Sequence, residues 1–414
     1  MTRHHCLLYL CLSVFICGSI LRTDAGDWPQ FLGPNRNSTS SEKGLATTWP
    51  KDGLPVVWRR DVGEGFSGPV ISGGKLILFH RVGTEEVVEC LDATNGKALW
   101  KFAYACGYED PYGKGNGPRS TPVVSGGKVY TLGAAGTLLC LGLDEGKELW
   151  RHDLPREYKV RRSFFGVGST PIIEGNLIAL NVGAVGAGIV AFDKDTGKEV
   201  WKATSQDASY ASPVAATIDG VRHLLFFTRE GLVSLDPANG NERFAKRWRS
   251  RMEASVNAAT PLVIGDQIFI TSSYNTGAVL LKAKKDGVEE VWSGDDILSC
   301  HYDTPVYHAG HLYGVDGRQE GGEAQLRCID LKTGKVCWSQ DHFGCASLIL
   351  ADGQLIVLAE TGDLILAEAN AEKYRERARA SLLTGPCRAH PALADGKLYA
   401  RDSKQLVCWN VKKN

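Results

Sequence analysis

The sequence predicts an all-β fold, an eight-bladed β-propeller built from four-stranded antiparallel blades. Two observations carry this prediction: a short phrase that ends in tryptophan recurs along the chain, and a proline-led apolar strand recurs between its copies. The composition agrees, because 47 glycines and only 2 methionines in 414 residues favour many turns and short strands over helices. A repeat of this length indicates an array of similar structural units.

The recurring phrase is a polar turn followed by a strand. It reads DATNGKALW at 92–100, DEGKELW at 144–150, DKDTGKEVW at 193–201 and DLKTGKVCW at 330–338, with blurred copies at 236–244 and 284–292. A polar Gly turn between two apolar runs is typical of a hairpin, so the phrase joins the third and fourth strands of a unit. The large ring is expected to pack on the turn of the neighbouring blade. These docking residues are Trp58, Trp100, Trp150, Trp201, Trp292 and Trp338, with Phe244 in their place in one unit.

The proline-led strand fixes the number of units. The prolines are Pro69, Pro122, Pro171, Pro213, Pro261, Pro305 and Pro391. Their spacing is 42 to 53 residues, except for a last interval of 86 that a degenerate copy at 345–370 divides in two. Eight units result, and radially packed units of this size are the blades of a propeller.

The two ends of the repeat region complete each other. The last unit, from residue 390, supplies three strands, whereas 54–62 is an unpaired fourth strand that carries its own Trp58. We therefore expect the N-terminal strand to close the ring, with a propeller over 54–414 and an N-terminal arm over 26–53. Residues 371–383 are rich in helix formers, but their position in the repeat predicts the outer strand of the seventh blade.

The first 25 residues have the pattern of a secretory signal peptide. A basic start is followed by an apolar run from Cys6 to Leu21 and by small residues up to Ala25. The alternative is an uncleaved membrane anchor. Cleavage predicts an exported protein, periplasmic or extracellular, without transmembrane contact. Removal of residues 1–25 takes away Arg3, Arg22 and Asp24 and leaves a net charge near −1, which offers nucleic acid no general attraction.

Nine cysteines follow the predicted cleavage site, and their pairing stays open in the sequence. An odd number leaves at least one free thiol or an intermolecular bond. Four of them, Cys90, Cys140, Cys328 and Cys408, occupy one equivalent repeat position. Equivalent positions in different blades are too far apart to bridge, so these four are predicted to be small buried residues.

The motif Asp-x-x-Thr-Gly-Lys-x-x-Trp resembles the tryptophan-docking repeat of the pyrroloquinoline-quinone-type (quinoprotein-like) propeller family. The motif is most complete at 193–201, and DWPQFLGPNRN at 27–37 resembles the mature start of exported bacterial members. The resemblance covers roughly 54–414 and implies the propeller fold. Family members include quinoprotein alcohol and glucose dehydrogenases and a non-enzymatic propeller of the outer-membrane protein assembly machinery, so the resemblance leaves the function open.

The chain departs from the dehydrogenases where their cofactors bind. Those enzymes stack the quinone (PQQ) on a disulfide between adjacent cysteines, and this sequence has no Cys-Cys pair. Covalent haem is excluded because no Cys-x-x-Cys-His occurs. The family's calcium ligands and base match no positions of this chain, and no metal ligands are predicted. The sequence therefore does not decide whether a quinone with calcium is the cofactor, and only the fold is inferred from the resemblance.

Residues just before the inner strands are predicted to surround the open end of the central channel. The ligand-binding candidates are Arg119, Tyr210, Asn257, His342, Arg388 and His390, joined from adjoining loops by Arg318, Glu320 and Glu360. His301 and Asp303 are the candidate catalytic pair, since imidazole titrates near neutral pH and could serve as a base. The alternative is that these side chains only satisfy one another and channel water.

Two function classes follow from these residues. The first is an exported protein that binds a ligand or partner through its channel mouth and interblade loops. The second is a periplasmic enzyme on a small molecule or carbohydrate, such as a PQQ-dependent oxidoreductase, so enzymatic activity is undecided. Mixed acids, bases and amides around one concavity suit an anionic or sugar-like small molecule, or else another exported protein.

Overall fold

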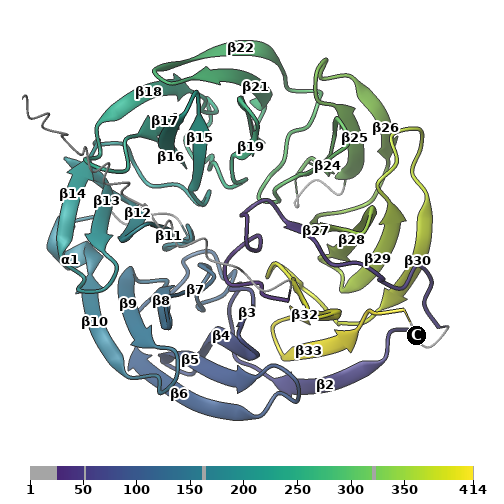
Figure 1. Ribbon diagram of the computed structural model, residues 1–414, viewed down its shortest axis with the longest axis horizontal. Coiled ribbons are helices and arrows are strands. Elements are labelled where there is room, and N and C mark those ends of the chain that lie inside the picture. Colours follow the sequence, from purple (N-terminus) through teal and green to yellow (C-terminus); the bar gives the residue numbers. More distant parts are fainter. Residues whose placement is uncertain (1–25, 51–52, 161–164, 319–322, 414) are drawn as a thin grey trace, which may run out of the picture.

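Eight sheets, seven of four strands and one of five, stand around a central axis in the computed structural model, which describes residues 26–50, 53–160, 165–318 and 323–413 (Figure 1). The predicted fold class, an eight-bladed propeller, is confirmed. Within each sheet, strands adjacent in sequence pair antiparallel. The predicted signal peptide, residues 1–25, and the predicted site residue Glu320 lie outside the described residues.

The blades are numbered in chain order, and the strands of each blade follow one another from the channel outward. Blade 1 is β3 (Val70–Ser72), β4 (Lys75–Val82), β5 (Glu85–Asp92) and β6 (Ala98–Ala105); blade 2 is β7 (Val123–Ser125), β8 (Lys128–Leu132), β9 (Thr137–Gly142) and β10 (Glu148–Asp153). Blade 3 is β11 (Ile172–Glu174), β12 (Leu177–Ala184), β13 (Ala187–Asp193) and β14 (Glu199–Ala203); blade 4 is β15 (Val214–Ile218), β16 (Val221–Phe227), β17 (Gly231–Leu235) and β18 (Glu242–Arg247).

The second half of the ring repeats the pattern with one added strand. Blade 5 is β19 (Leu262–Ile264), β20 (Gln267–Ser272), β21 (Gly277–Lys284) and β22 (Gly287–Gly294); blade 6 is β23 (Val306–His308), β24 (His311–Asp316), β25 (Gln325–Asp330) and β26 (Val336–Gln340). Blade 7 is β27 (Ala346–Ala351), β28 (Gln354–Ala359), β29 (Asp363–Glu368) and β30 (Glu376–Ser381), with β1 (Thr39–Ser40) parallel to β27. Blade 8 is β31 (Ala392–Ala394), β32 (Lys397–Arg401), β33 (Gln405–Asn410) and β2 (Val56–Asp61).

The N-terminal strand closes the ring, as the sequence predicts. β2 pairs antiparallel with β33, and this pairing places Trp58 opposite Cys408 (Figure 1). Strands from opposite ends of the chain therefore share one sheet.

Within the helix-prone segment 371–383, Glu376–Ser381 form the outer strand β30, and a strand here is what the sequence predicts. Its long side chains reach water and ion-pair: Arg379 lies 2.8 Å from Glu376 and 3.3 Å from Asp363 on the neighbouring strand. Place in the repeat outweighs helix propensity in this segment, because pairing with β29 satisfies the backbone. Helix α1 (Leu154–Tyr158) follows β10, and no helix in the described part of the chain is long and apolar enough to cross a membrane.

The repeated tryptophans join each blade to the next. Each indole N–H donates to a backbone carbonyl in or beside the polar turn of the following blade. The pairs are Trp58 to Ala93 (3.0 Å), Trp100 to Leu143 (2.8 Å), Trp150 to Lys194 (3.1 Å), Trp201 to Pro237 (2.9 Å), Trp292 to Leu331 (2.8 Å) and Trp338 to Asn370 (2.8 Å). The rings bury apolar surface between the sheets while this one polar atom keeps a partner.

The four repeat-equivalent cysteines are buried thiols, as expected. Each faces the docking tryptophan of its own sheet across the two outer strands. The pairs are Cys90 with Trp100, Cys140 with Trp150, Cys328 with Trp338 and Cys408 with Trp58. A small side chain at this position leaves room for the large ring on the neighbouring strand.

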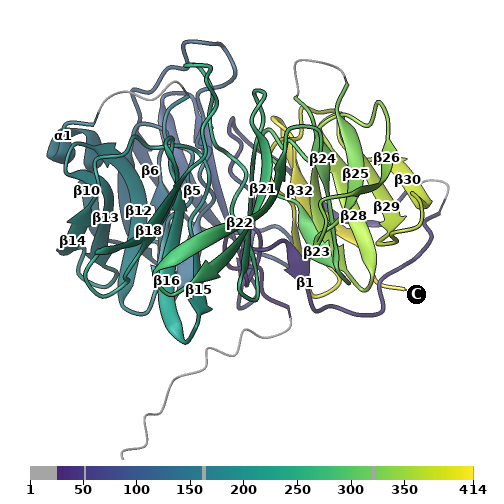
Figure 2. The ribbon, with the colours of Figure 1, turned by 90° about the horizontal axis from the view of Figure 1, so that it is seen from above.

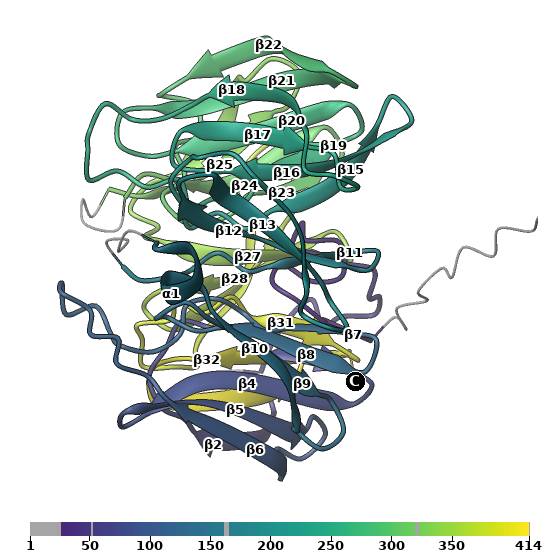
Figure 3. The same cartoon turned by 90° about the vertical axis from the view of Figure 1, so that its left-hand side faces the viewer.

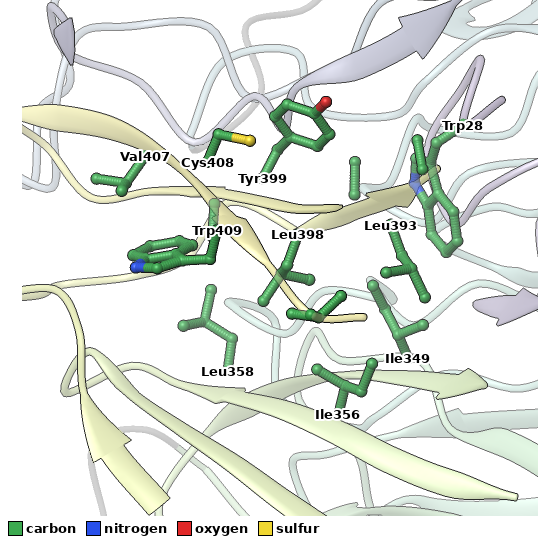
Figure 4. Packing of buried hydrophobic residues seen from close by; sticks show 14 of the residues in the cluster. Trp28, Ile349, Ile356, Leu358, Leu393, Leu398, Tyr399, Val407, Cys408 and Trp409 are labelled. Atoms are coloured by element: carbon green, nitrogen blue, oxygen red, sulfur yellow. The ribbon is translucent and has the colours of Figure 1, made fainter. Parts of the chain in front are cut away.

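The hydrophobic core lies between adjacent blades. Figure 4 shows the segment in which Ile356 and Leu358 of blade 7 meet Leu398 and Trp409 of blade 8, beside Trp28 of the arm. The arm therefore packs into the same core as the blades.

The arm crosses the middle of the ring (Figure 1). Arg36 is 5% exposed there, and its guanidinium donates to the carbonyls of Pro171 (2.8 Å) and Thr170 (2.9 Å). The longer interblade connections gather at one end of the channel (Figures 2 and 3). We call this loop-rich end, where the inner strands begin, the mouth.

Candidate functional site

A belt of hydroxyl groups fixes the start of the inner strands at the mouth. The residue before each strand-leading proline is Thr or Ser in blades 2 to 6, and its hydroxyl accepts a hydrogen bond from the backbone N–H of the preceding blade. The bonds run from Gly68 to Thr121 (3.2 Å), Thr121 to Thr170 (3.1 Å), Thr170 to Ser212 (3.0 Å), Ser212 to Thr260 (3.3 Å) and Thr260 to Thr304 (3.0 Å). The recurring Thr-Pro pair thus ties successive blades together directly beneath the mouth.

A pocket of about 250 Å³ opens above this belt. The residue three places before each strand-leading proline lines it in all seven blades that have such a proline: Phe66, Arg119, Gly168, Tyr210, Ala258, Tyr302 and Arg388. The repeat therefore places one residue from each of seven blades at the same concavity.

Aromatic rings dominate the pocket wall. Phe31 of the arm, Phe165 and Tyr274 join Phe66, Tyr210 and Tyr302. Phe165 lies 5.9 Å from the Tyr210 ring and 5.0 Å from that of Tyr112, which is 52% exposed at the rim. Such rings offer a large apolar surface and favour stacking with another aromatic group.

The cations at the pocket lie over ring faces. The guanidinium of Arg119 is 5.5 Å from the Phe66 ring centre, that of Arg388 is 5.4 Å from the same ring, and that of Arg318 is 4.4 Å from Tyr274. These distances are within the range of cation–π attraction.

Acidic partners already hold two of these arginines. Arg119 lies 3.6 Å from the buried carboxylate of Asp110, and Arg388 donates through Nε to Glu360 at 2.6 Å. Within the described residues, no protein acceptor bonds the terminal nitrogens of Arg388. Two of the guanidinium charges are therefore balanced, while Lys114 also lines the pocket and Arg388 keeps terminal donors that can reach an anionic group.

His301 belongs to the aromatic wall. Its Nε2 lies 2.9 Å from the Tyr274 hydroxyl, and its ring centre is 5.4 Å from those of both Tyr274 and Tyr302. The Asp303 carboxyl accepts a hydrogen bond from the Ala346 N–H. Of the candidate catalytic pair, His301 lines the pocket and Asp303 is buried.

Asp303 lies below the pocket and is 6% exposed. Burial, and then the nearby charge of Glu360, raise its pKa well above the usual range, which favours the neutral carboxyl. A neutral buried acid is a poor general base and a poor metal ligand.

The arm closes the pocket from below. Phe31 meets the His390 ring edge-on at 5.7 Å, and Trp28 stacks on the same ring at 6.2 Å. Burial lowers the pKa of His390 to about 4, so this imidazole is neutral at physiological pH. Phe31 and His390 are thus part of the pocket lining.

Eight of the sequence-predicted residues lie at the pocket or next to it. Those that line the pocket are Arg119, Tyr210, His301, Arg388 and His390. Those that support its wall or lie beneath it are Arg318, Glu360 and Asp303.

Two further candidates lie apart from the pocket. Asn257 is buried and donates through Nδ2 to the carbonyls of Thr228 (2.8 Å) and Trp248 (3.1 Å), a structural role between loops. His342 is exposed in the turn between β26 and β27 and does not line the pocket. It occupies the mouth connection of the degenerate blade 7, which lacks the leading proline.

Sequence reasoning missed the aromatic part of the wall. Phe66 and Tyr302 share the repeat position of Arg119 and Arg388, three residues before the proline, so an alignment of the repeats could have found them. No repeat position identifies Phe31, Phe165 or Tyr274, which reach the pocket from the arm and from irregular loops.

Comparison with known proteins gives one family and two kinds of relative. A family model described as outer membrane protein assembly factor BamB matches residues 83–340. The BamB of Moranella endobia is 24% identical over 266 residues, which cover 59% of this chain and 63% of that protein. The quinoprotein ethanol dehydrogenase of Pseudomonas aeruginosa is 29% identical over 192 residues, which cover 42% of this chain and 30% of that enzyme.

The solved structures show the same fold. The crystal structure of BamB from Moraxella catarrhalis superposes with a TM-score of 0.63 at 14% sequence identity, over 86% of this chain and 99% of that one. The chain spans less than two thirds of the length of the two curated relatives above.

Proposed function

The chain belongs to the PQQ-like propeller family whose model is described as outer membrane protein assembly factor BamB, and on that premise we propose that it is an exported binding protein whose mouth pocket holds a segment of another exported protein. The observation that carries the proposal is the mouth pocket, to which seven blades each contribute one residue and whose wall is mostly aromatic. Apolar concavities with a few polar groups are the usual binding sites of proteins.

The chemistry of the wall indicates what the segment would present. The aromatic surface of the pocket wall suits an aromatic side chain. The terminal nitrogens of Arg388 suit a carboxylate close to that side chain. An aromatic residue next to an acidic one is therefore the partner motif that we propose.

The alternative is an oxidoreductase that uses a quinone with calcium, as the dehydrogenase relatives suggest. Calcium needs six to eight oxygen ligands. Within the described residues, no group of three or more His, Cys, Asp or Glu side chains is placed to hold a metal ion. Around the pocket, Glu360 is bonded to Arg388 and Asp303 is buried with a raised pKa. These residues do not fit a calcium–quinone site, so binding is favoured over redox catalysis.

A peptide titration tests the proposal. Labelled unstructured peptides with a central Glu-Phe pair are titrated against residues 26–414, with Glu-Ala and Lys-Phe peptides as controls. We expect saturable binding of the Glu-Phe peptide. The affinity for either control peptide should be lower by roughly tenfold or more. Tyr210→Ala should weaken binding similarly, whereas Leu99→Ala, at an exposed outer-strand position, should leave it unchanged.

Two results would contradict this assignment. Equal affinity for the Glu-Phe and Glu-Ala peptides would show that the aromatic wall of the pocket does not recognise the peptide. Turnover of alcohols or sugars in a dye-linked assay with added quinone and calcium would favour the oxidoreductase.

A further inference from the structure

Two cysteines meet on the outer strands of blade 6. Cys328 on β25 faces Trp338 on β26, and the register shifts just beyond this pair, so Cys337 is an extra residue of β26 beside Cys328. Burial, and then the neighbouring Cys337, raise the pKa of Cys328, in keeping with this register. Cys328 is fully buried, whereas Cys337 is exposed, so the pair reaches from the sheet interior to solvent.

The repeat shows that this arrangement is particular to blade 6. Blades 1, 2 and 8 also place a cysteine opposite the docking tryptophan, but the residue before their tryptophan is Leu99, Leu149 or Val57. In blade 6 that residue is Cys337, the one exposed cysteine of the nine in the described residues. Blades 1, 2 and 8 therefore serve as the comparison for blade 6.

We propose that Cys328 and Cys337 are a dithiol that oxidises reversibly to a cross-strand disulfide. The oxidant is a disulfide compound, either a small molecule or a protein. The thiolate of Cys337 attacks one sulfur of that disulfide, forms a mixed disulfide and releases one thiol. The sulfur of Cys328 then attacks Cys337, the second thiol leaves, and the two protons of the original thiols pass to the departing thiolates.

The order of attack follows from exposure. Burial raises the pKa of Cys328, so its thiolate is scarce and sheltered, and oxidation begins at the accessible Cys337. Disulfides persist in exported proteins because those compartments are oxidising. The dithiol form is therefore expected in a reducing buffer and the disulfide form after export.

The disulfide would close a loop around the polar turn of blade 6. That turn receives the indole of Trp292 from blade 5 through the Leu331 carbonyl, at 2.8 Å. A cross-link between Cys328 and Cys337 constrains the unfolded chain on both sides of the turn. Oxidation should therefore raise the melting temperature by about 5 °C.

Intact-mass spectrometry after treatment with oxidised glutathione tests the proposal. The reduced protein should lose the mass of two hydrogens, and reductant should restore it. Cys328→Ala should instead keep one glutathione on Cys337, and Cys337→Ser should show neither change. Alanine is a tolerated residue at this position, because Ala191 faces Trp201 at the equivalent place in blade 3. Cys90→Ala is the matched control and should oxidise like the parent chain.

The proposal is overturned if the unaltered chain keeps a stable glutathione adduct at Cys337, since Cys328 would then be unable to resolve it. It is also overturned if Cys337→Ser still loses two hydrogens, because another pair of thiols would be responsible.

Discussion

Asp303, the predicted acidic partner of His301, is a buried carboxyl in the folded protein. The residue follows His301 by two positions, which suggests an acid–base pair. The fold buries it instead beside Glu360 and Cys345, with a hydrogen bond from the Ala346 backbone. Burial then controls its ionisation.

Replacing Asp303 with Asn should stabilise the protein near neutral pH. The folded-state pKa of Asp303 is raised, so its neutral form contributes stability fully below the unfolded pKa, and that contribution is lost as the pH rises towards the folded value. Asn cannot ionise and can still accept the Ala346 bond. Urea unfolding should show a gain in the free energy of unfolding at pH 7.5 that shrinks as the pH falls towards 4. A gain of equal size at both pH values would show that ionisation is not its cause.

The sequence predicted several residues that surround the mouth, but it did not predict that the pocket wall is mostly aromatic. The proline register identified Arg119, Tyr210 and Arg388, because the residues before each inner strand follow from the repeat. The aromatic character of the wall depends on Phe31 and Phe165. Their segments have no repeat, and only the folded chain brings them to the channel.

At the scale of the element, the polar turn of each blade is shaped to receive a ring. Gly240, with a φ of +73°, would place a Cβ 2.6 Å from Cε3 of Trp201. A left-handed turn and close packing both require glycine at this point. The sequence predicted this docking, because the turn and the tryptophan recur together.

Gly240→Ala should therefore cost more than an ordinary glycine substitution in a turn. Gly265 has a similar φ of +62°, but nothing lies within 4 Å of its Cβ position, so Gly265→Ala measures backbone strain alone. We expect a loss in the free energy of unfolding of about 1 kcal/mol for Gly265→Ala and about 3 kcal/mol for Gly240→Ala. Equal losses in denaturant titrations would show that the Trp201 contact contributes nothing.

At the scale of the whole molecule, the ring is held by strands from both ends of the chain. β2 completes blade 8, and the arm adds β1 to blade 7, the degenerate repeat that lacks a leading proline. The count of four strands per blade predicted the closure by β2. The parallel pairing of β1 could not be predicted, since a two-residue strand has no pattern of its own.

Loss of the closing strand should destabilise the propeller as a unit. Residues 63–414 lack β2, whereas residues 49–414 lack most of the arm but keep the pairing of β2 with β33. Thermal unfolding should show a midpoint lower by about 10 °C or more for 63–414 than for 49–414. Equal midpoints would show that β2 is dispensable for the ring.

The central claim is that the mouth binds a partner while the tryptophan turns only hold the blades together. Affinity for the Glu-Phe peptide and melting temperature, measured side by side for three variants, test it most directly. His301→Ala and Arg318→Ala should abolish binding and leave the melting temperature nearly unchanged, whereas Trp201→Ala should cost roughly 3–5 kcal/mol of stability and leave binding intact below its lowered melting temperature. If the two mouth variants unfold the protein but the folded fraction still binds normally, the mouth is a structural feature and the account is contradicted.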